Sequence, residues 1–265
     1  MQRFYALRWK NANKSHIKNY ITYLNKFQNL KVSTIRSHLS AIAFYIQAKY
    51  DRDPTASFAI KKLLHFYAKK DKITQCRLPI TEKILYKLID SLKYTCKNKY
   101  YKYAFAALYK TMFFLALRIS EISDYSQRFS HAIALQDIKI KRNYISVKLK
   151  SYKHSSETVK FQVTEIDYIS TIKKWIAVRG NKPGPLFVHK TNKPFTRLFI
   201  YDQLKVDLRQ IGLNPSSYNT HSFRKGRATS LAQKGYTSEQ IALIGRWKSN
   251  AFKTYICPSV IKMGK

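Results

Sequence analysis

The hydrophobic residues of this chain change their spacing once, and that change restricts the folds open to it. Up to about residue 134 they recur every three or four residues, as on one face of an α-helix. In SHIKNYITYLNKF, for example, the apolar positions are Ile17, Tyr20, Ile21, Leu24 and Phe27. From 135 to 163 apolar and polar residues alternate, which is typical of half-buried strands, and helical spacing then returns. The sequence therefore predicts a mainly α protein with a small antiparallel β-sheet, an α+β fold.

Three helical stretches fill the first 70 residues and predict a small all-α domain. They cover about 15–27, 34–50 and 57–68, with Ser33 as the predicted N-cap of the second. The following segment, AKKDKITQCRLPIT, is positively charged and weakly patterned, so we interpret it as a basic linker that lies on phosphates. The predicted boundaries are 1–70 for the helical domain, 71–79 for the linker and 80–265 for a larger domain.

The larger domain is predicted to contain helices on both sides of a three-stranded meander. One helix begins at Thr81, and a second runs through YAFAALYKTMFFLALRISEI, residues 103–122. The strands lie within 135–163, with breaks at Arg142-Asn143 and at 150–156. Later helices are expected at about 165–178, at 197–211 ended by Gly212, at 221–234 ended by Gly235, and from Thr237, where TSEQ is a capping box.

The charge of the chain is extreme. Fifty Lys+Arg against 14 Asp+Glu leave a formal net charge of +36, so the chain attracts polyanions, and nucleic acid is favoured. The basic residues are distributed through apolar periodic segments, and 45% of the chain is hydrophobic, which excludes a disordered basic arm. Charge alone leaves open a ribosomal or chromatin-type protein that coats phosphates without chemistry.

Several other classes are disfavoured by residue usage. Cys76, Cys96 and Cys257 are isolated and odd in number, which indicates a reducing compartment and argues against a thiolate zinc site. The histidines form no HxxxH pair, no apolar run approaches a membrane span, and MQRFYALRWK lacks a signal-peptide core. We therefore expect an intracellular protein with no metal and no membrane partner, nuclear if its source is eukaryotic and otherwise cytoplasmic or nucleoid-associated.

The stretch THSFRKGRATS combines a histidine and an arginine at helical spacing. Thr220 is predicted to cap a helix beginning at His221, so that His221 and Arg224 share one face of the first turn. That turn offers free backbone N–H groups and the positive end of the helix dipole, both suited to an anion. A bound phosphate would also offset the unfavourable position of Arg224 and Lys225 near the dipole. Taken alone, this stretch favours a solvated basic helix with His221 as an N-terminal polar residue.

Two further stretches carry candidate residues. In LALRISEIS, Arg118 follows a nearly all-apolar helix, so we expect its guanidinium to point into a cleft, with Glu121 three residues on to pin it. Alone, an ordinary Arg–Glu helix pair explains the same residues. GRWKSNAFKTYI is predicted to form a turn followed by a short basic helix. It contains Trp247 and, eight residues later, Tyr255.

Taken in order, LRISE, HSFRKGRATSLAQKG and IGRWKSNAFKTYI resemble the motifs of the tyrosine recombinases and integrases of phage, bacteria and mobile elements. The resemblance covers nearly the whole chain, because the N-terminal helical part is similar to the core-binding domain of that family. The wording THSFRKGRATSLA, GRWKS and YI is most similar to eukaryotic crypton-type and DIRS-type transposon recombinases. The resemblance implies double-stranded DNA as the partner, a homo-tetramer on paired DNA sites, and strand cleavage and rejoining without metal, ATP or any other cofactor.

The resemblance also implies roles for single residues. Arg118 and Arg224 would stabilise charge on the non-bridging phosphate oxygens, since guanidinium forks bind phosphate bidentately and stay charged. Tyr255 would be the nucleophile, because the phosphodiester of a phenol (pKa ~10) keeps its bond energy for religation. His221 would hydrogen-bond the phosphate and assist proton transfer. Trp247 stands where many relatives have a second histidine, and its indole N–H can donate but cannot titrate.

The general acid is expected from a lysine in the turn between two strands. LKSYKHSS resembles that turn of the relatives, and Lys153 sits best at its tip. Lys150 is the competitor, and Lys148 is expected to be a strand residue.

The sequence departs from the pattern of the relatives in two places. They often have Gly directly before the Leu-Arg of the first motif, where this chain has Ala116. Many also use a longer C-terminal helix to dock onto a neighbouring subunit, whereas Tyr255 is followed here by ICPSVIKMGK with the helix-breaking Pro258.

Two other functions fit the same residues. A type IB topoisomerase shares this chemistry but acts as a monomer that relaxes supercoils, and the separate helical domain and the Trp247 motif favour a recombinase over it. A DNA-binding protein derived from a recombinase and no longer catalytic is the other alternative. The presence of all the expected side chains argues against it.

Overall fold

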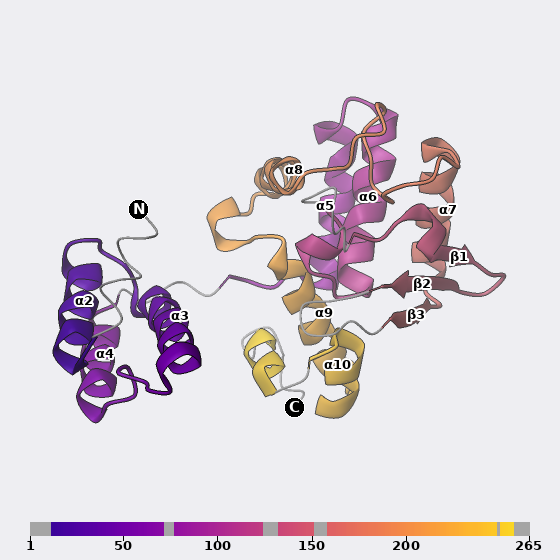
Figure 1. The fold of residues 1–265 in the computed structure, drawn as a ribbon. Coiled ribbons are helices and arrows are strands. Elements are labelled where there is room, and N and C mark those ends of the chain that lie inside the picture. The colour runs from indigo at the N-terminus through magenta and orange to yellow at the C-terminus, as the bar shows by residue number, and fades with distance from the viewer. Residues whose placement is uncertain (1–11, 72–76, 124–131, 151–157, 248–249, 257–265) are drawn as a thin grey trace. The chain divides into compact units, whose positions relative to one another are not determined.

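The computed structural model describes residues 12–71, 77–123, 132–150, 158–247 and 250–256. The chain divides into two compact units, Met1–Thr74 and Gln75–Lys265 (Figure 1). Both are built mostly from helices, and the second adds one three-stranded sheet, which confirms the predicted α+β class. No helix in the ranges given above is long and apolar enough to cross a membrane.

The first unit packs three helices, α2 (Lys14–Lys26), α3 (Val32–Tyr50) and α4 (Phe58–Lys70), around one core. Apart from Val32, which precedes the predicted second stretch, the core residues lie in the predicted helical stretches: Ile17, Ile21, Leu24, Val32, Ile35, Leu39, Ile60, Leu64 and Tyr67. Phe27, predicted on the apolar face of the first stretch, is exposed. The predicted cap at Ser33 is wrong, because α3 already begins at Val32. The backbone N–H of Val32 donates instead to Oδ2 of Asp71 at 2.8 Å, so a carboxylate from the end of α4 stabilises this positive helix end.

The second unit is organised around α6 (Lys99–Phe114), which is buried over most of its surface because nearly all its side chains after Tyr103 are apolar. Helices α5 (Glu82–Thr95), α7 (Ile166–Arg179) and α9 (His221–Gln233) pack against it. Helices α8 (Arg197–Gln210) and α10 (Ser238–Gly245) complete the unit. The predicted helix stops at Gly212 and Gly235 are confirmed, since both glycines have positive φ.

The sheet is the predicted antiparallel meander. Strands β1 (Ile138–Ile140), β2 (Ile145–Leu149) and β3 (Val159–Val163) follow the order β1-β2-β3. Along β2 the apolar residues Ile145, Val147 and Leu149 are buried, whereas Lys148 between them is exposed, as the period of two requires. Lys148 is therefore a strand residue, as expected. The turn between β2 and β3, with Lys153, falls in 151–157, outside the described residues.

Helix α6 ends earlier than predicted, and this end positions the first motif. The helix expected to run through Ile122 stops at Phe114, and Ala116 adopts a φ of 45°. The N–H of Leu117 donates to the carbonyl of Met112 at 3.0 Å, which closes the helix in the manner of a left-handed C-terminal cap. Arg118 is then extended and precedes the 3₁₀ turn η1 (Ile119–Glu121).

Replacing Ala116 by glycine is expected to stabilise the protein. A side chain at positive φ costs about 1–2 kcal/mol that glycine avoids, partly offset by the larger freedom of glycine in the unfolded chain. Ala116→Gly should raise the free energy of unfolding by up to about 1 kcal/mol in denaturant titration. Ala106→Gly, inside α6, is the control and should lower it by about 1 kcal/mol. A loss of stability in Ala116→Gly similar to that control would contradict the assignment.

The chain that enters the second unit is attached to the beginning of α9. The N–H groups of Leu78 and Ile80 donate to the carbonyls of Ser217 and Ser222 at 2.8 and 2.9 Å. On α9, a Cβ at Gly226 would lie 1.6 Å from the carbonyl oxygen of Ile80, so only glycine permits this approach. Residues 77–79, predicted as linker, thus pair with the second unit, and 72–76 lie outside the described residues.

Candidate active site

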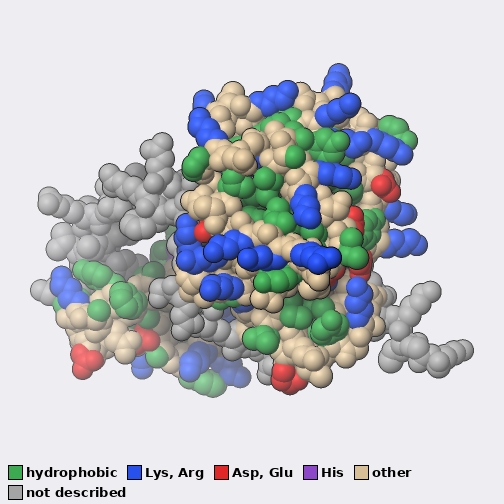
Figure 2. Space-filling model, turned by 90° about the vertical axis from the view of Figure 1, so that its right-hand side faces the viewer, with side chains coloured by type: hydrophobic (Ala, Val, Ile, Leu, Met, Phe, Trp, Pro, Cys, Tyr) green, Lys and Arg blue, Asp and Glu red, His purple; other side chains and the backbone are tan. Residues whose placement is uncertain are grey.

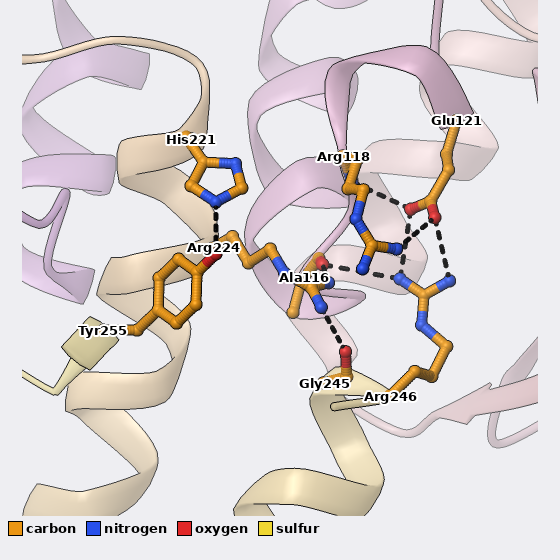
Figure 3. Close-up of polar contacts among 8 residues, drawn as sticks. All are labelled: Ala116, Arg118, Glu121, His221, Arg224, Gly245, Arg246 and Tyr255. Carbon is orange, nitrogen blue, oxygen red and sulfur yellow. Dashed lines mark hydrogen bonds and ion pairs between the residues drawn. The ribbon is translucent and has the colours of Figure 1, made fainter. Parts of the chain in front are cut away.

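The phenol hydroxyl of Tyr255 lies 2.8 Å from Nε2 of His221 (Figure 3). Tyr255 ends the 3₁₀ helix η4 (Asn250–Tyr255), and its carbonyl accepts from the hydroxyl of Thr229 on α9 at 3.2 Å. This bond holds the nucleophile candidate of the C-terminal motif against the helix that carries His221 and Arg224.

Helix α9 begins at His221 as predicted, but the predicted cap is wrong. The backbone of Thr220 is helical (φ −60°, ψ −26°), so its hydroxyl does not reach the free N–H groups of the first turn. Asn219 acts instead: its Oδ1 accepts from the N–H of His221 at 2.9 Å. His221 is thereby fixed at the helix start with its ring turned to Tyr255.

His221 is neutral at neutral pH. Burial first, and then the charges of Arg224, Arg118 and Lys225, lower the pKa of His221 to about 4. With its proton on Nδ1, the neutral imidazole presents Nε2 as an acceptor for the phenol O–H of Tyr255. Nε2 of His221 can therefore accept the proton of the Tyr255 hydroxyl as the phenol oxygen becomes a nucleophile.

This pKa predicts a pH dependence of stability. An unfolded histidine titrates near pH ~6.5. As the pH falls from there toward 4, the unfolded chain binds a proton that the folded chain does not, so the free energy of unfolding decreases through this window. The ring signals of His221 in NMR spectra of DNA-free protein should titrate with a midpoint below 5, and His221→Gln should flatten the stability profile between pH 6.5 and 4. A His221 midpoint near the ordinary value would contradict the burial assigned here.

Glu121 organises the first motif. Its side chain is 2% exposed, and its two oxygens accept from the backbone N–H of Arg118 at 2.8 Å and from Nη1 of Arg118 at 3.2 Å. The predicted contact between these residues is therefore present, although in a 3₁₀ turn and not within an α-helix. Arg118 keeps 21% of its side chain exposed, so a guanidinium with a fixed direction remains accessible.

Arg224 is completely buried. Its Nη1 donates to the carbonyl of Ala116 and its Nη2 to that of Gly245 at 2.5 Å, while the guanidinium lies 4.4 Å from the ring centre of Trp247. Burial, with Arg118 and Arg246 nearby, lowers the pKa of Arg224 to about 9, which leaves it charged at neutral pH. Arg224 thus connects the turns of the first and third motifs, a contact that the sequence analysis did not include.

Where the guanidinium of Arg224 lies against the indole of Trp247, two buried donors have no acceptor among the described residues. They are the buried Nε of Arg224 and the buried Nε1 of Trp247. Buried N–H groups are normally hydrogen-bonded, so two unused donors in contact indicate a ligand with acceptor oxygens. The guanidinium groups of Arg118 and Arg246 pair with the carboxylate of Glu121, and Arg224 shares the Ala116 carbonyl with Arg246, which leaves a net charge of +2 within these four side chains. The arrangement suits an anion.

The structure brings together six of the seven predicted site residues: Arg118, Glu121, His221, Arg224, Trp247 and Tyr255. The seventh, Lys153, lies outside the described residues. Its competitor Lys150 is exposed, and its ammonium lies 3.4 Å from the carboxylate of Asp137. Among the described residues, no group of three or more His, Cys, Asp or Glu could hold a metal ion.

One residue of the cluster was not predicted from the sequence. Arg246 is buried and pairs with Glu121 at 3.1 Å (Figure 3). Its sequence position, between Gly245 and Trp247 within the third motif, was the available signal. In a chain with 50 Lys and Arg, one more basic residue did not stand out.

The model of the phage integrase family matches residues 79–256, which include all three motifs and the cluster around Glu121. The chain belongs to the phage integrase family. This segment is two thirds of the chain and begins at the residues that pair with the start of α9.

Solved structures of DNA recombinases share the fold of this integrase-family chain. XerH site-specific recombinase, bound to a palindromic difH substrate, aligns with a TM-score of 0.68 and 16% identity over 93% of this chain and 69% of XerH. The Tn1549 transposon integrase in complex with circular intermediate DNA gives 0.65 and 16% over 94% and 82%. A lambda integrase dimer bound to a COC' core site gives 0.62 and 15% over 97% and 83%. No curated protein sequence matches the chain.

Proposed function

We propose that this chain is a site-specific DNA recombinase that cleaves and rejoins DNA strands through a 3′-phosphotyrosine at Tyr255. The observation that carries the proposal is the 2.8 Å contact between the Tyr255 hydroxyl and neutral His221, next to a cluster with excess positive charge. Membership of the phage integrase family supports the same chemistry.

In the proposed cleavage step, one bond to phosphorus forms as another breaks, and each proton that moves has a donor and an acceptor. The Tyr255 oxygen attacks phosphorus, its proton passes to Nε2 of His221, and the bond between phosphorus and the 5′-oxygen breaks. The departing 5′-oxygen takes a proton from a general acid, which we assign to Lys153. In the reverse direction the free 5′-hydroxyl attacks the phosphotyrosine, so religation needs neither ATP nor a metal ion.

Charge stabilisation is assigned to the arginine cluster. Negative charge grows on the non-bridging oxygens as the tyrosine attacks, and fixed cations in a water-poor site stabilise it more than water does. Arg118 is accessible and held by Glu121, while Arg224 and Trp247 contribute the unused N–H donors described above. Trp247 also lies with its ring centre 5.5 Å from that of Tyr255, so the indole is adjacent to the attacking group.

Duplex DNA is the proposed partner. The net charge of +36 favours phosphate binding, and Figure 2 shows a face on which Lys and Arg side chains greatly outnumber Asp and Glu. We assign residues 1–70 as the DNA-clamping domain and 80–265 as the catalytic domain, to which residues 77–79 of the predicted linker are attached, and we assign a homo-tetramer on paired sites as the working form. The similarity of THSFRKGRATSLA and GRWKS to crypton-type and DIRS-type enzymes supports a role in integrating or excising a mobile element, in the nucleus if the source is eukaryotic.

A covalent-trapping assay tests this function. Nicked duplexes that tile the DNA flanking the source gene lose their 5′-hydroxyl fragment after cleavage, so a protein–DNA adduct accumulates and is seen on denaturing gels. A recombinase gives an adduct that resists EDTA and exchanges strands between two duplexes. An adduct with supercoil relaxation but no exchange would indicate a topoisomerase. DNA binding with no adduct on any duplex would indicate a protein that is no longer catalytic.

A further inference from the structure

Arg246 occupies an unfavourable backbone position and is nevertheless buried. It ends α10 with φ 57° and ψ 44°, a left-handed conformation that residues other than glycine rarely adopt. Its side chain is only 4% exposed, although burial of a cation is costly unless it is paired. Contacts of the guanidinium must therefore offset both costs.

The first of these contacts is a two-pronged pair with Glu121. Nη1 of Arg246 lies 3.4 Å from Oε1, and Nη2 lies 3.1 Å from Oε2. The same two oxygens hold Arg118, through its Nη1 and its backbone N–H. A carboxylate gripped at both oxygens has one orientation, so the plane that Arg246 imposes on Glu121 also fixes the guanidinium of Arg118.

The second contact reaches the other catalytic arginine. Nη2 of Arg246 donates to the carbonyl of Ala116 at 3.4 Å, and the same carbonyl accepts from Nη1 of Arg224. Behind Arg246, the ring of Phe161 on β3 lies 4.9 Å from its guanidinium carbon and limits its movement. Arg246 thus contacts one acceptor of each of the two arginines assigned to the phosphate, the Glu121 carboxylate and the Ala116 carbonyl (Figure 3).

We propose that Arg246 is a positioning residue for strand cleavage, which acts through Glu121 and the Ala116 carbonyl to set the directions of Arg118 and Arg224. The inference rests on the proposed function. This role requires the planar fork of the Arg246 guanidinium, because a lysine at this position would keep the charge but could not bind both carboxylate oxygens of Glu121 in one plane.

Single-turnover cleavage of the trapping duplex is the first test. Arg246→Met and Arg246→Lys should both slow adduct formation by about 10- to 100-fold, the size of effect known for residues that orient metal ligands in metalloenzymes. DNA affinity at fixed salt should stay near that of the wild type, because Arg246 is buried and contacts no DNA in this proposal. Full activity of Arg246→Lys would show that charge alone suffices and would overturn the fork argument.

A double-mutant cycle separates positioning from general stability. Because Arg246 acts partly through Arg118, adding Arg246→Met to Arg118→Ala should reduce the rate by a smaller factor than Arg246→Met does in the wild type, and the remaining loss reports the route through Arg224. The matched control is Arg179, an equally buried arginine whose guanidinium donates to backbone carbonyls of Gly180, Lys182, Pro185 and Leu186. Any loss from Arg179→Met should multiply with that of Arg118→Ala. If the rate losses of Arg246→Met and Arg118→Ala multiply as fully as those of Arg179→Met and Arg118→Ala, Arg246 does not act through Arg118, and the proposed positioning role is overturned.

A measurement that does not depend on cleavage distinguishes a failure of the positioning role of Arg246 from a failure of the proposed recombinase function. Phenylglyoxal modifies accessible guanidinium groups, and the extent at Arg118 can be read by peptide mass spectrometry on DNA-free protein. Arg118 should react faster in Arg246→Met than in wild type or in Arg179→Met. Unchanged reactivity would overturn the positioning role, whereas absence of any adduct in the wild type would overturn the proposed function alone.

Discussion

Tyr255→Phe should form no covalent adduct with DNA and should bind DNA as tightly as the wild type. The substitution removes only the hydroxyl that contacts His221 at 2.8 Å. The ring contact with Trp247 and the bond from Thr229 to the backbone carbonyl remain, so the segment should keep its place. Trapping on nicked duplexes measures the adduct, and gel-shift titration at fixed salt measures binding.

Tyr236→Phe is the matched control for this experiment. Tyr236 is exposed near the end of α9, and the loss of its hydroxyl should leave the adduct unchanged. An adduct that persists in Tyr255→Phe would assign the nucleophile elsewhere, with Tyr236 and the buried Tyr218 as the nearest alternatives in the sequence.

Lys153→Ala should slow cleavage by about 10²–10⁴-fold, the usual effect of losing a positioned general acid. The leaving 5′-oxygen departs poorly as an alkoxide, so the chemical step depends on the proton. Lys150→Ala and Lys148→Ala should mainly weaken DNA binding, since the Lys150 ammonium is paired with Asp137 and Lys148 is an exposed strand residue. Single-turnover rates at saturating protein separate the two effects.

A substrate with sulfur in place of the 5′-bridging oxygen identifies the acid directly. A thiolate leaves without protonation, so Lys153→Ala should recover nearly wild-type cleavage on this DNA. A variant defective in binding would gain nothing from the sulfur. If Lys150→Ala is the variant that recovers, the acid lies three residues upstream of the position predicted from LKSYKHSS.

The fold was largely predictable because hydrophobic spacing reports directly which face of an element is buried. The alternation around Val147 and the stripe from Ile17 to Leu24 are examples. The end of α6 was not predictable in this way. Leu115, Ala116 and Leu117 are all buried, so the apolar pattern continues past the point where the helix stops. An alanine at positive φ cannot be recognised from the sequence, because alanine is usually a helix-forming residue.

The site was predictable to the level of its motifs but not of its internal contacts. The histidine and arginine three residues apart in the first turn of α9 also fitted a solvated basic helix, and the resemblance of the three motifs to the tyrosine recombinases was needed to nominate His221, Arg224 and Tyr255. That Arg224 donates to carbonyls 108 and 21 residues away depends on tertiary packing, which spacing does not encode. The same holds for Arg246 and its partner Glu121, 125 residues apart.

The attachment of residues 77–80 to the start of α9 restricts how this protein can be re-engineered. A chimaera that borrows the first unit of another integrase must be joined upstream of Arg77, whose carbonyl accepts from Lys225 on α9 at 3.0 Å. A junction placed after Ile80 would replace the segment that fits against Gly226, and any graft with a different backbone path there would meet the helix that carries His221. The absence of a side chain at Gly226 on α9 therefore determines where the units of two proteins can be joined.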